Sequence, residues 1–294
     1  MRFWKRKVRV TVSGKGGSAS FIGDQSPEPG LAITFSTTLN IGSKQNSGSV
    51  TITNLSASTR NKLGEEYDTL TLEVGYEDGG YSTIMKGDIR DVTHAKSSPD
   101  IDSTIEVGDG DKAVEKGTAS KTFPTGTKPK DIVQYLQGQL PGVTKGEVKG
   151  LDNLPKTKRP VTVFGRASSN LDKLGREHQF YWSIQHGTSQ VVKADEHLGG
   201  NILISAETGL VGVAEPTDKG VKFKALLNPA LLPGKTVDVR SDFLDEGSGR
   251  EKRSTDDGGG IHRIATVTFS GTTRSDDFYA EVEANRVQGE KVKK

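Results

Sequence analysis

The sequence LTLEVGYEDGGY at residues 70–81 combines two patterns that decide the fold. The apolar residues of its first half recur at every second position: Leu70, Leu72, Val74 and Tyr76. This period of two is typical of a β-strand with one buried face. Glu77-Asp78-Gly79-Gly80 is a strong hairpin-turn signal, so we expect a return strand from about Tyr81. The stretch therefore predicts antiparallel sheet.

The same alternation extends the sheet on both sides of this hairpin. We expect the first 107 residues to be mostly antiparallel sheet, with strands in residues 3–12, 31–41, 50–55 and 101–107. Residues 13–30 are rich in Gly, Ser and Pro and are predicted to be a loop. Ser56 to Leu63 predicts one or two helical turns, with Ser56 or Ser58 as the cap and Gly64 as the stop.

The strand at residues 3–12 has a basic face. Val8, Val10 and Val12 lie on one side, opposite a face that contains Lys5, Lys7 and Arg9. Two interpretations are open: these bases form a solvated face, or they face a polyanion or an acidic neighbour.

The middle of the chain changes to mixed structure. A helix is predicted from Thr127-Lys128-Pro129, because Ile132, Val133, Leu136 and Leu140 have helical spacing and proline is tolerated in a first turn. Residues 141–160 are expected to be a loop, and a second helix is expected from Ser168 or Ser169. Residues 180–193 predict a hairpin with its turn at Gln185-His186-Gly187-Thr188.

The last third returns to strands. They are expected at about residues 201–206, 210–214, 221–227, 235–240, 262–270 and 278–284. Residues 242–260 interrupt them with a polar, mixed-charge stretch that cannot supply core, so we predict a long exposed loop there.

Composition excludes several classes of protein. The chain has 294 residues, which suggests two or three modules, and it has no run of about 20 apolar residues that could span a bilayer. It contains no cysteine, which excludes disulfides and thiolate chemistry. The net charge is +2, so there is no overall nucleic-acid footprint. A basic start without a following apolar stretch is not a secretory signal.

Searches for catalytic, cofactor and metal motifs fail. A phosphate-binding loop that ends in Gly234-Lys235-Thr236 requires its first glycine at position 229, where this chain has Pro229, and the segment lies between expected strands. No serine has a Gly-x-Ser-x-Gly surround. The spacings of His178, His186 and His197 do not fit two ligands on one helical turn. The acidic residues at 100–111 are interpreted as a solvated strand face and its turn. We therefore expect no enzyme, no cofactor and no metal site.

Three stretches in a fixed order resemble a known family. The first is Ser49-Val50-Thr51-Ile52-Thr53-Asn54-Leu55-Ser56, and the second is Asn170-Leu171-Asp172-Lys173-Leu174 followed by Trp182-Ser183-Ile184-Gln185. The third contains Ala206-Glu207-Thr208-Gly209-Leu210, Leu226-Leu227-Asn228-Pro229 and the tail Gly271 to Tyr279. Together they resemble the baseplate hub proteins of long-tailed, chiefly contractile, bacteriophages over most of residues 30–290. The insertion at 242–260 departs from the shorter connection that is common in the family.

The resemblance implies a fold class and three regions. The protein would be mainly β with a few short helices (α+β), and it would contain two tail-tube-like antiparallel β-barrel modules. These modules would span residues 1–110 and 206–294, with a small mixed α/β middle region at 111–205.

The resemblance also implies a function. The protein would be a homotrimer in which six barrels imitate one tube layer and adapt the sixfold tail tube above to the threefold central spike below. Other baseplate proteins would contact it, and DNA would pass through its channel without specific binding. It would be located in the virion tail baseplate, after assembly in the host bacterial cytoplasm, with no membrane insertion.

Other functions stay open at this point. The protein could be the hub of a phage-derived injection or secretion machine, a tail-tip enzyme that degrades cell wall, or a carbohydrate-binding β-protein. A cell-wall enzyme would need a catalytic pair that we do not find, and a carbohydrate platform would need more aromatic residues than 6%.

The 242–260 loop is the candidate partner interface. Long loops without secondary structure are often functional. We expect this one to reach a neighbouring subunit, in the tube or an adjacent baseplate ring; a solvated insertion is the alternative. The candidate contact residues are Phe243, Leu244, Arg250, Lys252 and Arg253.

Overall fold

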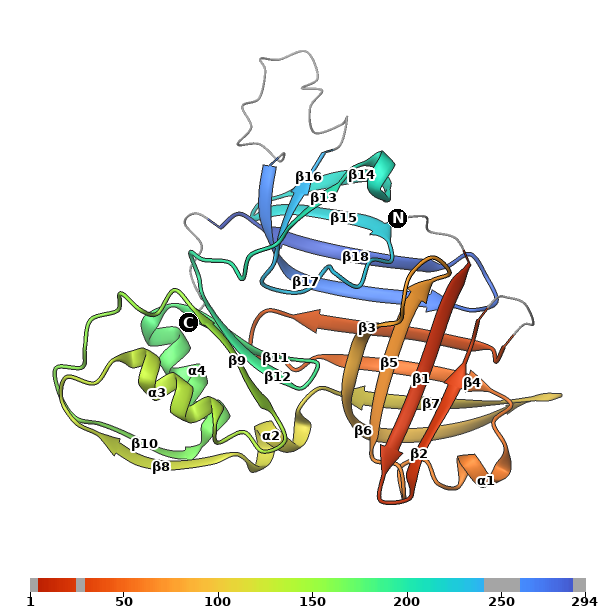
Figure 1. Ribbon diagram of the computed structural model, residues 1–294, viewed down its shortest axis with the longest axis horizontal. Coiled ribbons are helices and arrows are strands. Elements are labelled where there is room, and N and C mark those ends of the chain that lie inside the picture. Colours follow the sequence, from red (N-terminus) through yellow and green to blue (C-terminus); the bar gives the residue numbers. More distant parts are fainter. Residues whose placement is uncertain (1–4, 25–29, 241–259, 288–294) are drawn as a thin grey trace, which may run out of the picture.

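The computed structural model describes residues 5–24, 30–240 and 260–287 (Figure 1). The strands of the largest sheet, in chain order, are β1 (Arg6–Gly14), β2 (Gly17–Ile22), β3 (Ile33–Asn40), β4 (Ser47–Thr53), β5 (Thr69–Tyr76), β6 (Ser82–Ser97), β7 (Asp100–Gly108), β13 (Asn201–Ile204), β14 (Leu210–Thr217), β15 (Gly220–Leu226), β16 (Thr236–Val239), β17 (Gly260–Thr272) and β18 (Phe278–Asn285). The short helix α1 (Ala57–Arg60) and the 3-10 turn at Ala206–Thr208 lie between these strands. The protein is mainly β, as the sequence predicts.

These strands form one continuous sheet. Its order is β14-β15-β18-β17-β3-β4-β7-β6-β5-β1-β2, with β16 also paired to β17 and β13 paired to β16. The seven N-terminal strands thus join the six C-terminal strands through the antiparallel pair β3–β17, in which Thr34 faces Thr272 and Asn40 faces Thr266. One hydrophobic core runs under both halves and includes Val10, Leu72 and Val282.

The expected closed barrels are not found among the described strands. A strand has two hydrogen-bonding edges, and β3 uses one for β4 and the other for β17. Neither edge is left for a ladder with β2 that would close the first half. Among the described strands, the main path of the sheet therefore ends at β2 on one side and at β14 on the other, and the branch from β17 through β16 ends at β13.

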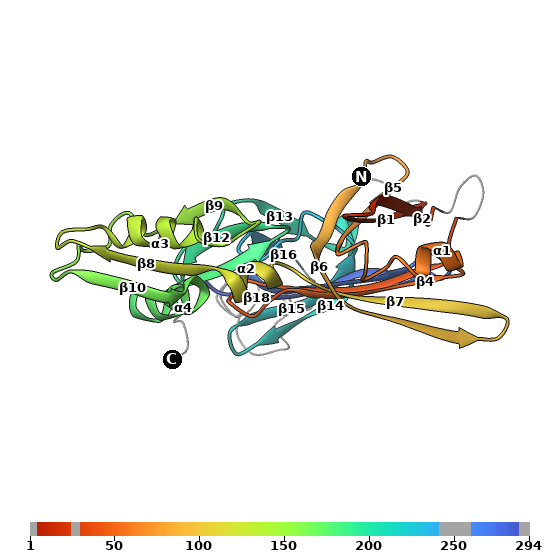
Figure 2. The ribbon, with the colours of Figure 1, turned by 90° about the horizontal axis from the view of Figure 1, so that it is seen from below.

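The middle of the chain packs as a smaller α/β unit with its own core (Figure 2). Its elements are α2 (Asp111–Lys116), β8 (Thr118–Phe123), α3 (Pro129–Gln137), β9 (Thr144–Lys149), β10 (Val161–Arg166), α4 (Ala167–His178), β11 (Phe180–Gln185) and β12 (Thr188–Lys193). β8 pairs with β10, and β11-β12-β9 form a three-stranded sheet. Both predicted helices and the predicted hairpin are confirmed, while the division at residues 110 and 205 stays a prediction.

Two stretches predicted to be loops contain strands. β2 pairs with β1 across the Lys15–Gly16 turn, and β9 pairs in parallel with β12. Phe21 is the one buried side chain of β2, and no side chain of β9 is fully buried. Edge strands of this kind form through backbone pairing, so their sequences lack a strong apolar period.

The basic face of β1 meets acidic neighbours on β5 and in the turn after it. Arg9 forms a two-pronged ion pair with Glu73, with Nε–Oε2 and Nη2–Oε1 distances of 2.7 and 2.9 Å. Lys5 pairs with Glu77 at 3.0 Å. These two bases therefore meet acidic neighbours within the same chain, and they do so on a face that is still partly exposed to solvent.

No helix in the described part of the chain is both long enough and apolar enough to cross a membrane.

Candidate functional site: the sheet seam and the buried junction

The described residues contain no cluster of three or more His, Cys, Asp or Glu side chains that could hold a metal ion. The rejected phosphate motif lies in the connection between β15 and β16, with Thr236 as the first residue of β16. Three structural features are described below: two sets of contacts between parts of the chain, and the free edges of the sheet.

The first feature is the seam between the two halves of the sheet. Across β3 and β17, hydroxyl groups pair side by side: Thr38 with Thr268 at 3.1 Å, and Thr34 with Thr272 at 3.2 Å. Ile33 N–H donates to the hydroxyl oxygen of Thr273, which in turn donates to the carbonyl oxygen of Leu31, both at 3.0 Å. The seam thus has side-chain bonds in addition to its backbone ladder.

Aromatic packing closes the seam beneath the sheet. The fully buried ring of Phe278 contacts Phe35 and Tyr76 edge-on, with centroid distances of 5.8 and 5.6 Å. The buried hydroxyl of Tyr76 donates to the carbonyl oxygen of Leu227 at 3.0 Å, and burial raises the pKa of Tyr76. Tyr76 and Leu227 come from opposite halves of the chain. The two halves are therefore held in one fixed relation.

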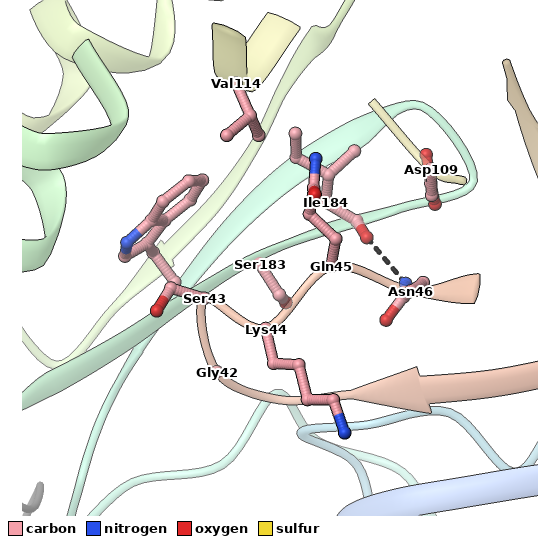
Figure 3. A pocket seen from close by; sticks show the side chains of 10 residues that line it. Gly42, Ser43, Lys44, Gln45, Asn46, Asp109, Val114, Ser183 and Ile184 are labelled. Carbon is pink, nitrogen blue, oxygen red and sulfur yellow. Dashed lines mark hydrogen bonds between the residues drawn. The ribbon is translucent and has the colours of Figure 1, made fainter. Parts of the chain in front are cut away.

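The second feature is a buried polar junction between the sheet and the α/β unit (Figure 3). Asp109 follows β7 and is 1% exposed. Its carboxylate accepts from the backbone N–H groups of His186 at 2.6 Å and Gly187 at 3.1 Å. His186 and Gly187 both have positive φ angles, of 53° and 76°, and form the tight turn between β11 and β12. Asp109 therefore anchors the tip of that hairpin to the large sheet.

Asn46 completes the junction from the other side. Its side-chain oxygen accepts from Asn40 N–H at 2.8 Å, and its amide donates to Ile184 O at 2.8 Å and to Gln185 Oε1 at 2.9 Å. Gln185 Nε2 donates back to the carbonyl oxygen of Asn40 at 2.7 Å. A buried amide that is bonded at both ends specifies one arrangement of the two units.

Burial governs the electrostatics of this junction. It raises the pKa of Asp109 to about 7, while the two N–H donors and the side chain of Asn46 act in the opposite direction. Burial also lowers the pKa of the neighbouring His186. The sequence-based interpretation of Asp109 as a solvated turn residue is wrong, because the β11–β12 hairpin covers it.

The third feature is the set of open strand edges. Within the described chain, β2, β13 and β14 each have a partner on one side only. β6 has no partner for the residues after Ile89 on the edge that faces away from β7. In both views the β6–β7 ribbon extends past the rest of the sheet (Figures 1 and 2). Open edges can pair with strands of another chain.

The five residues predicted to contact a partner are Phe243, Leu244, Arg250, Lys252 and Arg253. They lie in residues 241–259, outside the described residues. Their role stays a prediction.

Comparison with known proteins decides the family. The family model described as baseplate hub gp41 matches residues 7–284. The chain belongs to this baseplate hub family. The resemblance expected from the sequence is thereby confirmed. A search of the curated proteins finds no match.

Solved structures similar to this hub protein agree on the fold. The 43 kDa tail protein of prophage MuSo2 from Shewanella oneidensis has a TM-score of 0.62 at 8% identity, covering 95% of this chain and 97% of that one. A tail protein from Neisseria meningitidis MC58 has a TM-score of 0.62 at 12% identity, covering 96% and 97%. The Escherichia coli c3393 protein, a component of the type VI secretion system, has a TM-score of 0.57 at 12% identity, covering 92% and 78%.

Proposed function

We propose that this hub protein forms a homotrimeric ring that adapts the sixfold tail tube to the threefold central spike and continues the channel for DNA. The main observation in support is the β3–β17 seam, which joins two β regions edge to edge in one chain. Three copies would present six such regions to the six subunits of a tube layer. The tube protein, the spike protein and other baseplate proteins would be its partners.

The open edges support ring formation. β2, β14 and the outer part of β6 leave backbone N–H and C=O groups available for another chain. Closed rotational symmetry covers such edges without leaving a free end. Mixed acidic and hydroxyl-bearing strand faces suit a channel that does not retain DNA, because clustered bases would bind phosphate.

The proposed role is structural and not enzymatic, in the tail baseplate of a virion that is assembled in the bacterial cytoplasm. Family membership and the structural likeness to tail proteins support it. The likeness to the Escherichia coli type VI protein supports one alternative, the hub of a phage-derived injection machine. Genes for tube, spike and portal proteins next to this one would distinguish the two settings.

The mass and symmetry of the purified protein test the proposal. A chain of 31.5 kDa predicts a trimer of roughly 95 kDa. Mass photometry over a range of concentrations, followed by single-particle imaging, should give threefold rings with near-sixfold symmetry on one side. A monomer that persists when the tube and spike proteins are added would contradict it.

Deleting residues 244–258 tests the proposed contact of the 242–260 segment with a neighbouring subunit. The isolated variant should fold, because β16 and β17 remain and long insertions contribute little to folding. Joining to the tube or an adjacent ring should weaken. Complete infectious particles at normal yield would favour a solvated insertion.

A further inference from the structure

Positive charge is concentrated in one part of the α/β unit. Residues 116–166 contain ten Lys and Arg against three Asp and Glu, a net charge of +7 in a chain whose total is +2. One of the three acids, Asp152, is paired with Lys130 at 2.6 Å. The rest of the chain therefore has a net negative charge, opposite in sign to that of this segment.

A cavity of about 370 Å³ opens within this basic part, between the start of α3, the loop before β10 and the end of α4. Its apolar lining includes Pro129, Ile132 and Leu174, which are buried, and the half-buried Val161. A volume of this size accommodates one or two large apolar side chains.

Charged side chains surround the apolar lining. Lys156, Lys158 and Arg159 are exposed, and none has an ion pair with a described residue. Glu177 and His178 complete the rim from α4. Three cations against one carboxylate around an apolar floor fit a partner segment that carries apolar side chains next to several carboxylates.

This chain contains such a segment. Asp242-Phe243-Leu244-Asp245-Glu246 has two large apolar residues flanked by three carboxylates, with no base among them. It follows β16, and in both views β16 lies away from the end of the α/β unit that carries α3 and β10 (Figures 1 and 2). A second copy placed beside the first can present the segment where the same chain is poorly situated to do so.

We propose that the cavity bounded by α3, the 155–159 loop and α4 is a docking site for residues 242–246 of a second copy of this chain. Phe243 and Leu244 enter the apolar part, and the three carboxylates face Lys156, Lys158 and Arg159. The proposal rests on the ring proposed above. It assigns the segment to a contact within that ring, in place of the contact with the tube or an adjacent ring. The binding site for the 242–260 insertion would then lie on another copy of the same chain.

Peptide binding tests the chemistry of the site without requiring assembly of a tail. The receptor is the full chain with Phe243→Ser and Leu244→Ser, so that its own segment does not compete. The probe is a labelled peptide of residues 241–247, followed by fluorescence anisotropy. We expect saturable binding of this peptide and no binding of a peptide in which Phe243 and Leu244 are replaced by serine. Adding Lys158→Glu and Arg159→Glu to the receptor should lower the affinity for the peptide on the order of tenfold.

A matched control separates the cavity from the general positive charge. Lys145→Glu with Lys149→Glu changes the charge equally on exposed positions of β9, outside the cavity lining. This pair should leave peptide affinity within about twofold, because surface charges at a distance are screened. No binding, equal binding of the serine peptide, or equal loss in both charge variants would overturn the proposal.

Disulfide trapping tests whether the contact joins two copies. Because the chain has no cysteine, Leu244→Cys and Lys158→Cys can be made in separate chains and mixed under mild oxidation. We expect a covalent dimer that needs both variants. Absence of that dimer while rings still form would overturn the docking site and leave the ring intact. A chain carrying both cysteines that closes on itself without dimers would overturn the second-copy assignment.

Discussion

Replacing Asp109 with asparagine tests whether burial or hydrogen bonding controls the junction between the sheet and the α/β unit. The variant keeps the size of the side chain and one acceptor oxygen. Its NH₂ group would face one of the two N–H groups of His186 and Gly187 that the carboxylate now accepts from. Relative to the ionised carboxylate, one buried donor loses its partner, which costs about 1–3 kcal/mol.

The pH dependence gives the sharper expectation. Burial raises the pKa of Asp109 to about 7, whereas an aspartate in an unfolded chain has a pKa of about 3.9. Between these values the folded protein holds a proton that the unfolded chain has released. Asp109 therefore contributes stability that is fully present below about pH 4 and is lost as the pH rises to 7. At about 1.4 kcal/mol per unit, the whole change is on the order of 4 kcal/mol.

Urea unfolding of the wild type and Asp109→Asn between pH 5 and pH 8 measures this effect. The fluorescence of Trp182, which lines the junction pocket, is a suitable signal. Groups common to both proteins cancel in the difference between their free energies of unfolding. We expect the free energy of unfolding of the wild type, measured relative to that of the variant, to fall as the pH rises to 7 and then to level off.

The exposed Asp78→Asn is the control for loss of a carboxylate, and its difference from the wild type should show no such slope. A wild-type advantage over Asp109→Asn that stays constant, or grows with pH, would refute the reasoning. It would mean that the two N–H donors outweigh burial and that the ionised carboxylate is the stable form.

Three further changes test the seam and the sheet. Tyr76→Phe removes the buried bond to Leu227 and should lower the free energy of unfolding in urea by about 1–2 kcal/mol; an unchanged value would mean that this bond adds nothing. Phe278→Ala empties the space between Phe35 and Tyr76 and should cost about 3–5 kcal/mol by the same assay, and a loss below 1 would show that the seam can collapse around it. Gly87→Ala places a Cβ 2.2 Å from the carbonyl oxygen of Gly108, so β6 and β7 must separate; a melting temperature equal to that of the wild type would contradict this.

Local patterns were sufficient to predict elements that bury one face. β1 and β5 have strict alternation, and their apolar residues are all buried. The sequence offers Ser56 or Ser58 as the cap of α1, and in the structure Ser56 is the cap and accepts from Thr59 N–H. β2 and β9 could not be predicted in this way, since they are held by backbone pairing and bury little.

Features that depend on contacts between residues far apart in the chain could not be predicted from the sequence. Asp109 resembles its exposed neighbours in sequence, and its burial depends on His186 and Gly187, 77 and 78 residues away. β3 pairs with both β4 and β17, and no local sequence pattern near β3 indicates this. The resemblance implied two closed barrels, and the seam explains why one chain has a single open sheet instead.

The long separation within the seam also sets the order of events during synthesis. β3 and β17 pair residues that are 226 to 238 positions apart. At about 5–20 residues per second, a ribosome needs roughly 10–50 s to make β17 after β3 has appeared. During that interval one edge of β3 is uncovered, although β4 to β7 can already form the neighbouring ladders. Aggregation of nascent chains should therefore depend on elongation rate and on truncation before residue 260, and co-translational chaperones would act in this window.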